Sequence, residues 1–212
     1  RDVLVQPDGR IVVAGHHDSG YALVARCHAD GSLDSSFGSG GKVFTSQSGL
    51  DIMTQCFGLA LQGDGKLVLA GMSYTNDFAL MRLNANGTPD SSFSNTAVPG
   101  MVSTGVGTAQ DLAYDVAVQG DGRVVAVGYA FNANTNSNDF AVVRYNANGT
   151  LDTSFQSTGK VTTTFSGGMS TVRGVLIAPD GRIIVAGHAR NGANDDFALV
   201  RYDGAGSLAT TS

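Results

Sequence analysis

The sequence predicts an all-β protein built from four tandem copies of one unit. A ten-residue block that contains an Asp-Gly pair followed by apolar residues occurs four times. Its copies are residues 6–15, 62–71, 119–128 and 178–187, so that successive copies start 56, 57 and 59 residues apart. Short apolar runs alternate with Gly, Asn and Asp turns, and no stretch has the 3.6-residue period of an amphipathic helix. Repetition at this spacing is typical of a β-propeller.

The third copy shows the four expected strands of one unit most clearly. They are residues 115–119, 123–127, 140–145 and 160–165. The Asp-Gly pair between the first two strands favours a tight hairpin, because Gly accepts positive φ and Asp can bond its own backbone. A single four-stranded sheet cannot cover both of its faces without neighbours. We therefore expect four blades, each an antiparallel sheet of four strands.

One propeller region should span residues 1–212. We expect its blades at about residues 1–48, 49–106, 107–168 and 169–212. The fourth copy reaches Ser212 before its last strand, so its blade should be incomplete. The chain is then a segment of a larger ring, one of two or more chains that complete a ring of about eight blades, or a closed four-bladed ring. In each case something should cover the unpaired outer edge.

Composition excludes some partners. Only 15% of the residues are charged and the net charge is −5, so no basic stripe is available for nucleic acid. Polar residues or Gly interrupt every apolar run well before the roughly 18 to 20 residues of a membrane span. Lys and Glu are scarce while Gly, Ser, Thr, Asn and Ala are abundant. This composition favours an extracellular or cell-surface protein.

Two further blocks complete the repeat and carry a family resemblance. They are residues 77–87 (DFALMRLNANG), 139–149 and 196–206, and residues 33–37 (LDSSF), 89–93 and 151–155. In this order the blocks resemble the bacterial delta-60 repeat, a β-propeller repeat of otherwise unassigned function. The resemblance covers essentially the whole chain and implies a propeller fold. The first copy departs from the pattern with Gly20-Tyr21 in place of Asp-Phe, and the second has Pro89 in place of Leu.

Four arginines occupy the same position of the third strand in each copy. They are Arg26, Arg82, Arg144 and Arg201. Strand alternation places Arg144 on the same face as Phe140 and Val142, so the guanidinium needs a partner on an apolar side. The aspartates of the following turn are plausible partners, namely Asp34, Asp90 and Asp152. Because the pair recurs, we interpret it as a structural lock rather than a ligand site.

Loop length points to one face for binding. The loops between the second and third strands are expected to be five residues long in the first two copies, ten in the third (129–138) and seven in the fourth (188–194). Variation on a fixed scaffold is where function is usually placed. The candidate ligand-binding residues are Tyr74, Tyr129, Phe131, Asn132, Asn134, His188 and Arg190. Their aromatic rings and amides suit a protein or carbohydrate partner.

Two aspartates are weak catalytic candidates. Asp2 and Asp115 occupy equivalent positions at the first strand, where propeller enzymes commonly place their sites at the channel mouth. Paired carboxylates could act on a saccharide or a lactone. Gly58 and Gly174 replace them in the other copies, so the pattern is an alternation and no recognisable motif.

Metal and disulfide chemistry are not expected. The turn at 146–152 has oxygen side chains at alternate positions, as calcium loops do, but the same residues make ordinary turns. His16 and His188, expected in exposed loops, would be neighbours only in a closed four-bladed ring. Cys27 and Cys56 should lie at opposite ends of a blade, which excludes a disulfide.

The leading hypothesis is a non-catalytic extracellular propeller module that serves as a scaffold or adhesion-type binding surface. Every strong feature repeats in each copy, and no catalytic motif is present. The alternatives are a hydrolase or lyase with carboxylates at the channel mouth, and a structural repeat stiffened by calcium.

Overall fold

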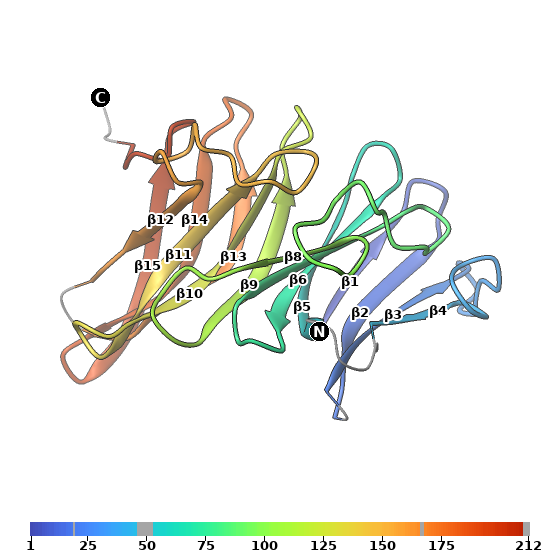
Figure 1. The fold of residues 1–212 in the computed structure, drawn as a ribbon, viewed down its shortest axis with the longest axis horizontal. Coiled ribbons are helices and arrows are strands. Elements are labelled where there is room, and N and C mark those ends of the chain that lie inside the picture. The colour runs from blue at the N-terminus through green and yellow to red at the C-terminus, as the bar shows by residue number, and fades with distance from the viewer. Residues whose placement is uncertain (19, 46–52, 166–167, 210–212) are drawn as a thin grey trace.

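The computed structural model describes residues 1–18, 20–45, 53–165 and 168–209, which contain fifteen strands and no helix (Figure 1). The first sheet consists of β1 (Asp2–Val5), β2 (Ile11–His17), β3 (Tyr21–Cys27) and β4 (Lys42–Phe44). The second consists of β5 (Met53–Leu61), β6 (Leu67–Ser73), β7 (Phe78–Leu83) and β8 (Met101–Thr104). The third consists of β9 (Asp111–Val118), β10 (Val124–Asn132), β11 (Ser137–Tyr145) and β12 (Lys160–Thr163), and the fourth of β13 (Ser170–Ile177), β14 (Ile183–Asn191) and β15 (Asn194–Tyr202).

Each sheet is an antiparallel meander in chain order, and the fourth has three strands within the described residues. The expected all-β fold of four blades, with an incomplete fourth, is therefore confirmed. The tight turns after the first strand of each blade have the predicted geometry, with glycine φ values of 84°, 84°, 85° and 82°. The boundary expected at 48/49 lies outside the described residues.

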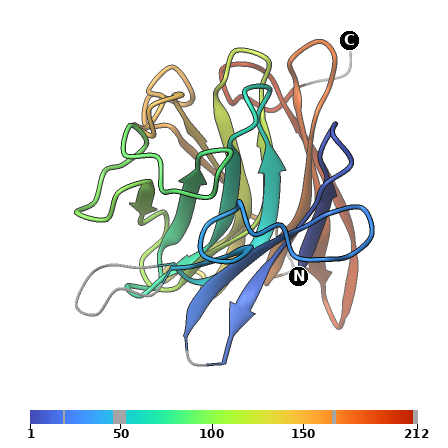
Figure 2. The ribbon, with the colours of Figure 1, turned by 90° about the vertical axis from the view of Figure 1, so that its right-hand side faces the viewer.

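The sheets are stacked face to face in chain order (Figures 1 and 2). Every extensive contact between sheets joins consecutive sheets, and the first strands of neighbouring sheets form the converging inner edges. Three apolar clusters fill the three gaps between the four sheets. Within the described residues the blades thus form an open arc, and the reading as a closed four-bladed ring is wrong.

Strand alternation gives each blade two different apolar faces. We call the face toward the following blade the forward face and the face toward the preceding blade the rear face. In the third blade Phe140 and Val142 point forward into the cluster shared with the fourth blade. Ala141 and Val143 point to the rear, into the cluster shared with the second blade. Successive residues of a strand point to opposite faces, and a neighbouring blade covers each face, so the central strands are apolar on both sides.

The expected ten-residue loop at 129–138 is wrong. β10 continues to Asn132 and pairs with β11, which begins at Ser137, so only residues 133–136 connect them. Asn136 takes the positive φ of 49° that this tight connection requires. The fourth blade is similar, since β14 ends at Asn191 and β15 begins at Asn194. Asn and Thr in these segments suggested loops, but cross-strand pairing extends the ladder through them.

The two cysteines are free thiols, as expected. Cys27 ends β3, whereas Cys56 lies within β5 rather than before the strand. Burial raises the pKa of the Cys56 thiol to about 12. Among the residues that the structure describes, none forms a helix long and apolar enough to cross a membrane.

Candidate functional site

Bulges interrupt the first strand of three blades and place side chains outside the pairing register. One bulge in β5 skips Thr54, and the equivalent bulges of β5, β9 and β13 skip Phe57, Tyr114 and Arg173. Arg1 occupies the equivalent sequence position just before β1. A bulge adds a residue to one strand and redirects its side chain, and bulges are frequent next to functional sites.

These four side chains form a continuous stripe along the converging inner edges. The Arg1 guanidinium lies 5.4 Å from the centre of the Phe57 ring. The ring centres of Phe57 and Tyr114 are 5.2 Å apart, and the Arg173 guanidinium lies 4.1 Å from the centre of the Tyr114 ring. His16 and Tyr129, from the second strands, flank the stripe at 5.3 Å from Phe57 and 6.1 Å from Tyr114.

We call these six residues the inner stripe: Arg1, His16, Phe57, Tyr114, Tyr129 and Arg173. The three aromatic rings are half-buried, while both arginines are exposed. A guanidinium stacked on a ring keeps its N–H edge available for a carboxylate. Two cations at the ends and three rings between them make a surface that suits a ligand with flat apolar faces and negative charge.

The two candidate catalytic aspartates join neighbouring blades through their carboxylates. Asp2 accepts a hydrogen bond from the Leu59 backbone N–H of the second blade at 2.7 Å, and another from Val3 N–H at 2.8 Å. Asp115 repeats this arrangement. It accepts from Val175 N–H of the fourth blade at 2.9 Å and from Val116 N–H at 2.8 Å.

We call this arrangement the inner clasp, and it explains the alternation of Asp and Gly. The first strand is the inner edge of its sheet, so some of its N–H groups lack a ladder partner, and the carboxylate satisfies one on each of two blades. A Cβ on Gly58 would lie only 2.7 Å from the Cα of Asp115, so glycine permits the second and third blades to approach. Burial raises the pKa of Asp115 above its ordinary value, although its backbone hydrogen bonds act in the opposite direction.

Asp111 holds the connection that leads into the third blade. It lies at the start of β9 and is fully buried. One carboxylate oxygen accepts from Val106 N–H at 2.6 Å and Gly107 N–H at 2.8 Å, and the other accepts from Phe131 N–H at 3.2 Å. Burial raises its pKa despite these bonds.

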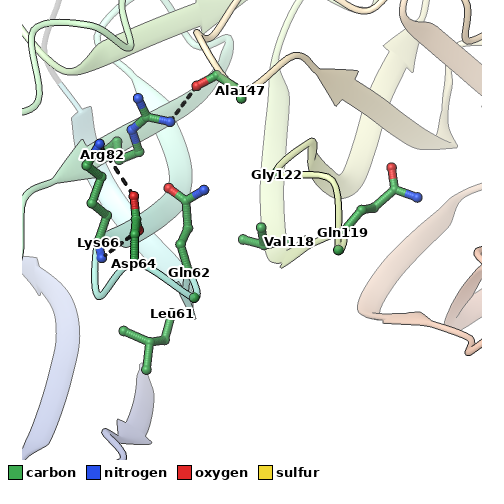
Figure 3. A pocket seen from close by; sticks show the side chains of 11 residues that line it. Leu61, Gln62, Asp64, Lys66, Arg82, Val118, Gln119, Gly122 and Ala147 are labelled. Carbon is green, nitrogen blue, oxygen red and sulfur yellow. Dashed lines mark hydrogen bonds and ion pairs between the residues drawn. The ribbon is translucent and has the colours of Figure 1, made fainter.

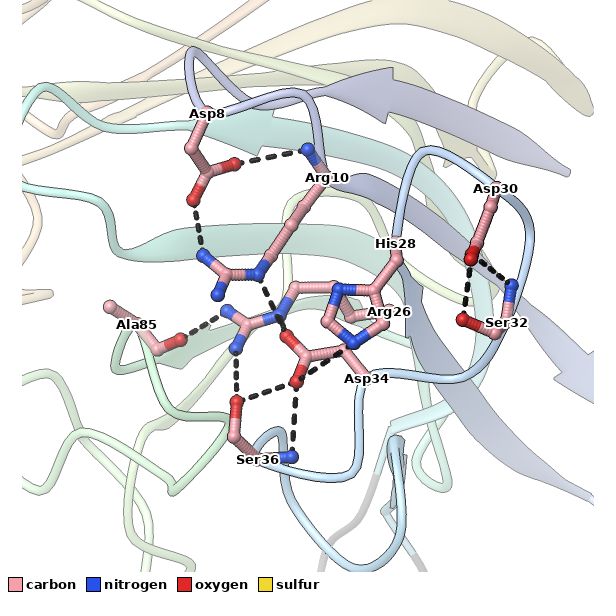
Figure 4. A network of polar contacts seen from close by, with 9 residues as sticks. All are labelled: Asp8, Arg10, Arg26, His28, Asp30, Ser32, Asp34, Ser36 and Ala85. Atoms are coloured by element: carbon pink, nitrogen blue, oxygen red, sulfur yellow. Dashed lines mark hydrogen bonds and ion pairs between the residues drawn. The ribbon is translucent and has the colours of Figure 1, made fainter.

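The structure brings the repeated arginines and aspartates together in the first three blades, and Figure 4 shows the pair of the first blade, Arg26 and Asp34. The Nε of Arg26, Arg82 and Arg144 donates to Asp34, Asp90 and Asp152 at 2.8, 2.8 and 2.7 Å. Each guanidinium also lies about 4.5 Å from the centre of a buried ring, that of Phe37, Phe93 or Phe155. In the fourth blade Ala209 stands where the aspartate would be, so Arg201 does not form this pair.

We call these three Arg–Asp pairs the locks. The arginine of each lock also donates a hydrogen bond to a backbone carbonyl of the next blade. The Nη1 of Arg26 donates to the Ala85 carbonyl at 2.5 Å, that of Arg82 to Ala147 at 2.5 Å and that of Arg144 to Gly204 at 2.8 Å. The hydrogen bond from Ser36 Oγ, aided by the Arg26 guanidinium, lowers the pKa of Asp34 to about 2 despite its desolvation. These arginines are therefore engaged within the scaffold.

The predicted ligand-binding residues divide into two groups. Tyr129 and His188 lie in β10 and β14, and Tyr129 belongs to the inner stripe. The others lie at the hairpin ends, away from the stripe. There Asn132 donates to Asp139 at 2.8 Å and Arg190 donates to Asp195 at 3.1 Å, while Tyr74 is 74% exposed. Asn134 N–H donates to Asn132 Oδ1 at 3.0 Å within the β10–β11 hairpin, whereas Phe131 N–H donates to Asp111 of β9 at 3.2 Å.

Two clefts lie at the opposite end, between the tight turns of neighbouring blades, and Figure 3 shows the one between the second and third blades. One of about 490 Å³ lies between the second and third blades, with Gln62, Lys66 and Arg82 in its wall. A similar one of about 460 Å³ lies between the first and second blades, where Gln6 and Arg10 are equivalent. Because the same cleft recurs at successive junctions, we interpret it as part of the scaffold.

The turns that resembled calcium loops are closed by their own hydrogen bonds. Asn148 Oδ1 accepts from Thr150 N–H at 3.1 Å and from its hydroxyl at 2.7 Å. The described residues contain no group of three His, Cys, Asp or Glu side chains that could hold a metal ion. His16 lies in β2 and is half-buried against the Phe57 ring, so the expectation that it lies in an exposed loop is wrong.

Sequence reasoning missed Phe57, Tyr114 and Arg173. The usable signal was their shared position, directly before the alternating Gly58, Asp115 and Gly174. Strand alternation alone assigns these residues to the wrong face, because a bulge shifts the register by one.

Comparisons with known proteins agree on the repeat. The family model described as "Domain of unknown function (DUF5122) beta-propeller" matches residues 6–37, 62–93, 119–155 and 178–211. No curated protein matches the chain.

Two solved structures resemble it at low identity. An endo-arabinase from Bacteroides thetaiotaomicron is 13% identical over 93% of this chain and 72% of its own, with a TM-score of 0.46. A candidate exo-beta-1,3-galactanase from Bifidobacterium bifidum is 14% identical over 99% of this chain and 70% of its own, with a TM-score of 0.48. Since the family model covers more than half of the residues, in all four blades, the chain belongs to the DUF5122 β-propeller family of unknown function.

Proposed function

We propose that this protein is a non-catalytic binding module and that the inner stripe is its ligand-contacting surface. The observation that carries the proposal is the alignment of four side chains on consecutive inner strands, three of them at bulges and the fourth, Arg1, at the equivalent position before β1. The bulge itself recurs in three blades, but the side chain that it carries changes from Phe to Tyr to Arg. Unlike the locks, the stripe carries different residues in neighbouring blades, with Arg, Phe, Tyr and Arg in order.

The chemistry of the stripe favours an acidic saccharide. Half-buried aromatic rings offer flat apolar surfaces for sugar rings, and Tyr114 and Tyr129 add hydroxyl groups. Arg1 and Arg173 lie at the two ends and can donate paired hydrogen bonds to carboxylates. The chain as a whole carries a net charge of −5, so a local pair of arginines stands out against its surroundings.

The enzyme alternative has less support. In Asp2 and Asp115 each carboxylate oxygen already accepts a backbone N–H, and two of these four bonds cross between blades. A general acid or base needs an oxygen within reach of the substrate. The calcium alternative has no particular contact in its favour, since the turn oxygens bond within their own turns.

Isothermal titration calorimetry with oligogalacturonate, in which every sugar carries a carboxylate, tests the proposal. A neutral galactose oligomer of equal length is the matched probe. We expect heat with the acidic oligomer, weaker binding of the neutral one, and at least a roughly tenfold loss of affinity in Arg173→Gln, since a charged hydrogen bond contributes about 1.5–3 kcal/mol. Arg182→Gln, an exposed arginine at the tight turn of the fourth blade and outside the stripe, is the control.

Equal binding of both oligomers would contradict the role of the arginines, and no heat with either would contradict the saccharide. Binding of poly-glutamate alone would replace the saccharide by an acidic protein partner. An extracellular or cell-surface location and an adhesion-type role are part of this proposal, and they rest on the composition. The blocks that resemble the delta-60 repeat support a bacterial origin.

A further inference from the structure

The two ends of the arc leave apolar faces uncovered. On the forward face of the fourth blade Phe197 is 93% exposed, Leu199 67% and Leu176 62%. The equivalent residues of the third blade, Phe140 and Val142, are completely buried against the fourth blade. The fourth blade thus presents the same kind of surface that its three predecessors use to bind their successors.

The first blade presents the complementary half. On its rear face Val5 is 66% exposed, Val3 59% and Val13 40%. In the second blade the residues equivalent to Val3 and Val13 are Leu59 and Leu69, which are 7% and 0% exposed because the first blade covers them. Most of the large exposed apolar side chains in the described residues lie on these two faces, with Leu33 and Phe44 on the first blade as further members. Contiguous exposed apolar residues of this kind mark interaction sites.

We propose that the forward face of the fourth blade packs on the rear face of the first blade of a second copy of this chain. The established interface between consecutive blades supplies the template, since it occurs three times within the chain. A hollow of about 460 Å³ on the fourth blade, with Phe197, His188 and Arg173 in its wall, is the receiving surface. Two copies joined at both ends contribute eight blades, which is within the range of propellers.

The alternation of Asp and Gly at the inner edge fits this partner. Along the chain the first strands carry Asp2, Gly58, Asp115 and Gly174, and the next position in a head-to-tail pair is again Asp2. The new junction would therefore repeat the one between the second and third blades. There a glycine admits the backbone of the following aspartate-bearing strand.

The junction would bring two arginines together. Of the two carboxylates in the same hollow, Asp195 is paired with Arg190 at 3.1 Å and Asp196 accepts from Asn191 at 2.9 Å. By analogy with Phe57 and Tyr114, whose rings are 5.2 Å apart, Arg173 would lie beside Arg1 of the second copy. Like charges repel, and salt screens them. Association should therefore tighten as the ionic strength rises. Arg173→Phe, which recreates the Arg–Phe pair of Arg1 and Phe57, should lower the dissociation constant several-fold at low salt.

Light scattering coupled to size-exclusion chromatography tests the proposal on the 212-residue chain over a range of concentrations. We expect a mass twice that of one chain, and one-chain mass for both Phe197→Asp and Val5→Asp. An equimolar mixture of the two variants should regain the two-chain mass, because each mixed pair keeps one intact junction. Tyr74→Asp, an exposed aromatic residue on neither face, is the control and should associate like the wild type.

A wild type of one-chain mass throughout the concentration range would overturn the proposal. Association that survives Phe197→Asp would also overturn it. If Phe197→Asp abolished association while Val5→Asp did not, two fourth blades would be packing on each other, and the head-to-tail arrangement would be wrong. Thermal melting of each variant, followed by circular dichroism, distinguishes loss of association from loss of folding.

Discussion

The lock at the tight-turn end and the stripe at the inner edge are built on the same four blades, but they treat repetition in opposite ways. The Arg–Asp distance is 2.7 or 2.8 Å in all three blades that contain it, and the stacked ring is always Phe. The stripe carries a different residue in successive blades, and its contacts alternate between cation–π and aromatic pairs. The Arg–Asp positions that hold the blades together are repeated, whereas the stripe positions, which we propose to face a ligand, differ between neighbouring blades.

Breaking a lock should give the largest effect on stability. Asp90→Ala leaves the Arg82 guanidinium, only 4% exposed, without its carboxylate. We expect the free energy of unfolding to fall by about 3 kcal/mol or more, because removal of one partner leaves a buried charge uncompensated. Urea denaturation measures the loss. The double variant Arg82→Met with Asp90→Leu should recover part of it, and a double variant that is less stable than the single one would contradict this reason.

Acid should weaken the same locks. The pKa of Asp34 is lowered to about 2 by the Ser36 hydrogen bond first, and the net shifts of Asp90 and Asp152 are also downward although burial opposes them. A carboxylate with a lowered folded-state pKa contributes stability above its unfolded pKa, near 3.8, and loses it as the pH falls toward the folded value. The melting temperature should thus fall steeply as the pH is lowered from 4 to about 2. A melting temperature that stays constant over this range would speak against the ion pairs.

Removal of an inner clasp should have a smaller effect. Asp115→Ala deprives Val116 and Val175 of their acceptor at a partly solvated edge. We expect a loss of about 1–2 kcal/mol in urea unfolding, since only backbone N–H groups near water are left unpaired. Hydrogen exchange should quicken at Val175, and unchanged protection there would show that Asp115 does not join the third and fourth blades.

The ion pair between Lys66 and the aspartate of the second lock should contribute least to the free energy of unfolding. The Lys66 ammonium lies 3.1 Å from Asp90 but its side chain is 29% exposed. Lys66→Ala should cost less than about 1 kcal/mol, as pairs near the surface do. A loss equal to that of Asp90→Ala would mean that the buried Arg82 is not the main partner.

Much of the scaffold could be predicted from the sequence. The spacing of the repeated blocks predicted the four blades. The side-chain period of two along a strand placed Arg144 on the same face as Phe140, where its charge needed a partner such as Asp152. Both patterns, the spacing of the blocks and the alternation along a strand, are local and are retained in the folded structure. The asymmetry of Asp2 and Asp115 against Gly58 and Gly174 was also visible, but its meaning depends on how closely neighbouring inner strands approach, which no single strand reveals.

The candidate site was largely hidden for a physical reason. Tyr114 and Arg173 face the inner edge only because a bulge shifts their register, and a bulge leaves no local periodicity. Long polar hairpins were mistaken for loops, since Asn132 and Ser137 pair across the ladder in spite of their low strand propensity. Tyr129 was predicted to contact a ligand from the composition of an expected loop, and not from its place beside Tyr114.

The most direct test compares Arg82→Ala with Arg173→Gln in urea unfolding at neutral pH, on equal protein concentrations. Arg82 lies in a repeated lock and Arg173 in the variable stripe, and both lie within about 5 Å of the centre of an aromatic ring. We expect Arg82→Ala to lower the free energy of unfolding by about 3 kcal/mol and Arg173→Gln to change it by less than about 1 kcal/mol. Equal losses would contradict the division between a repeated scaffold and a variable binding surface.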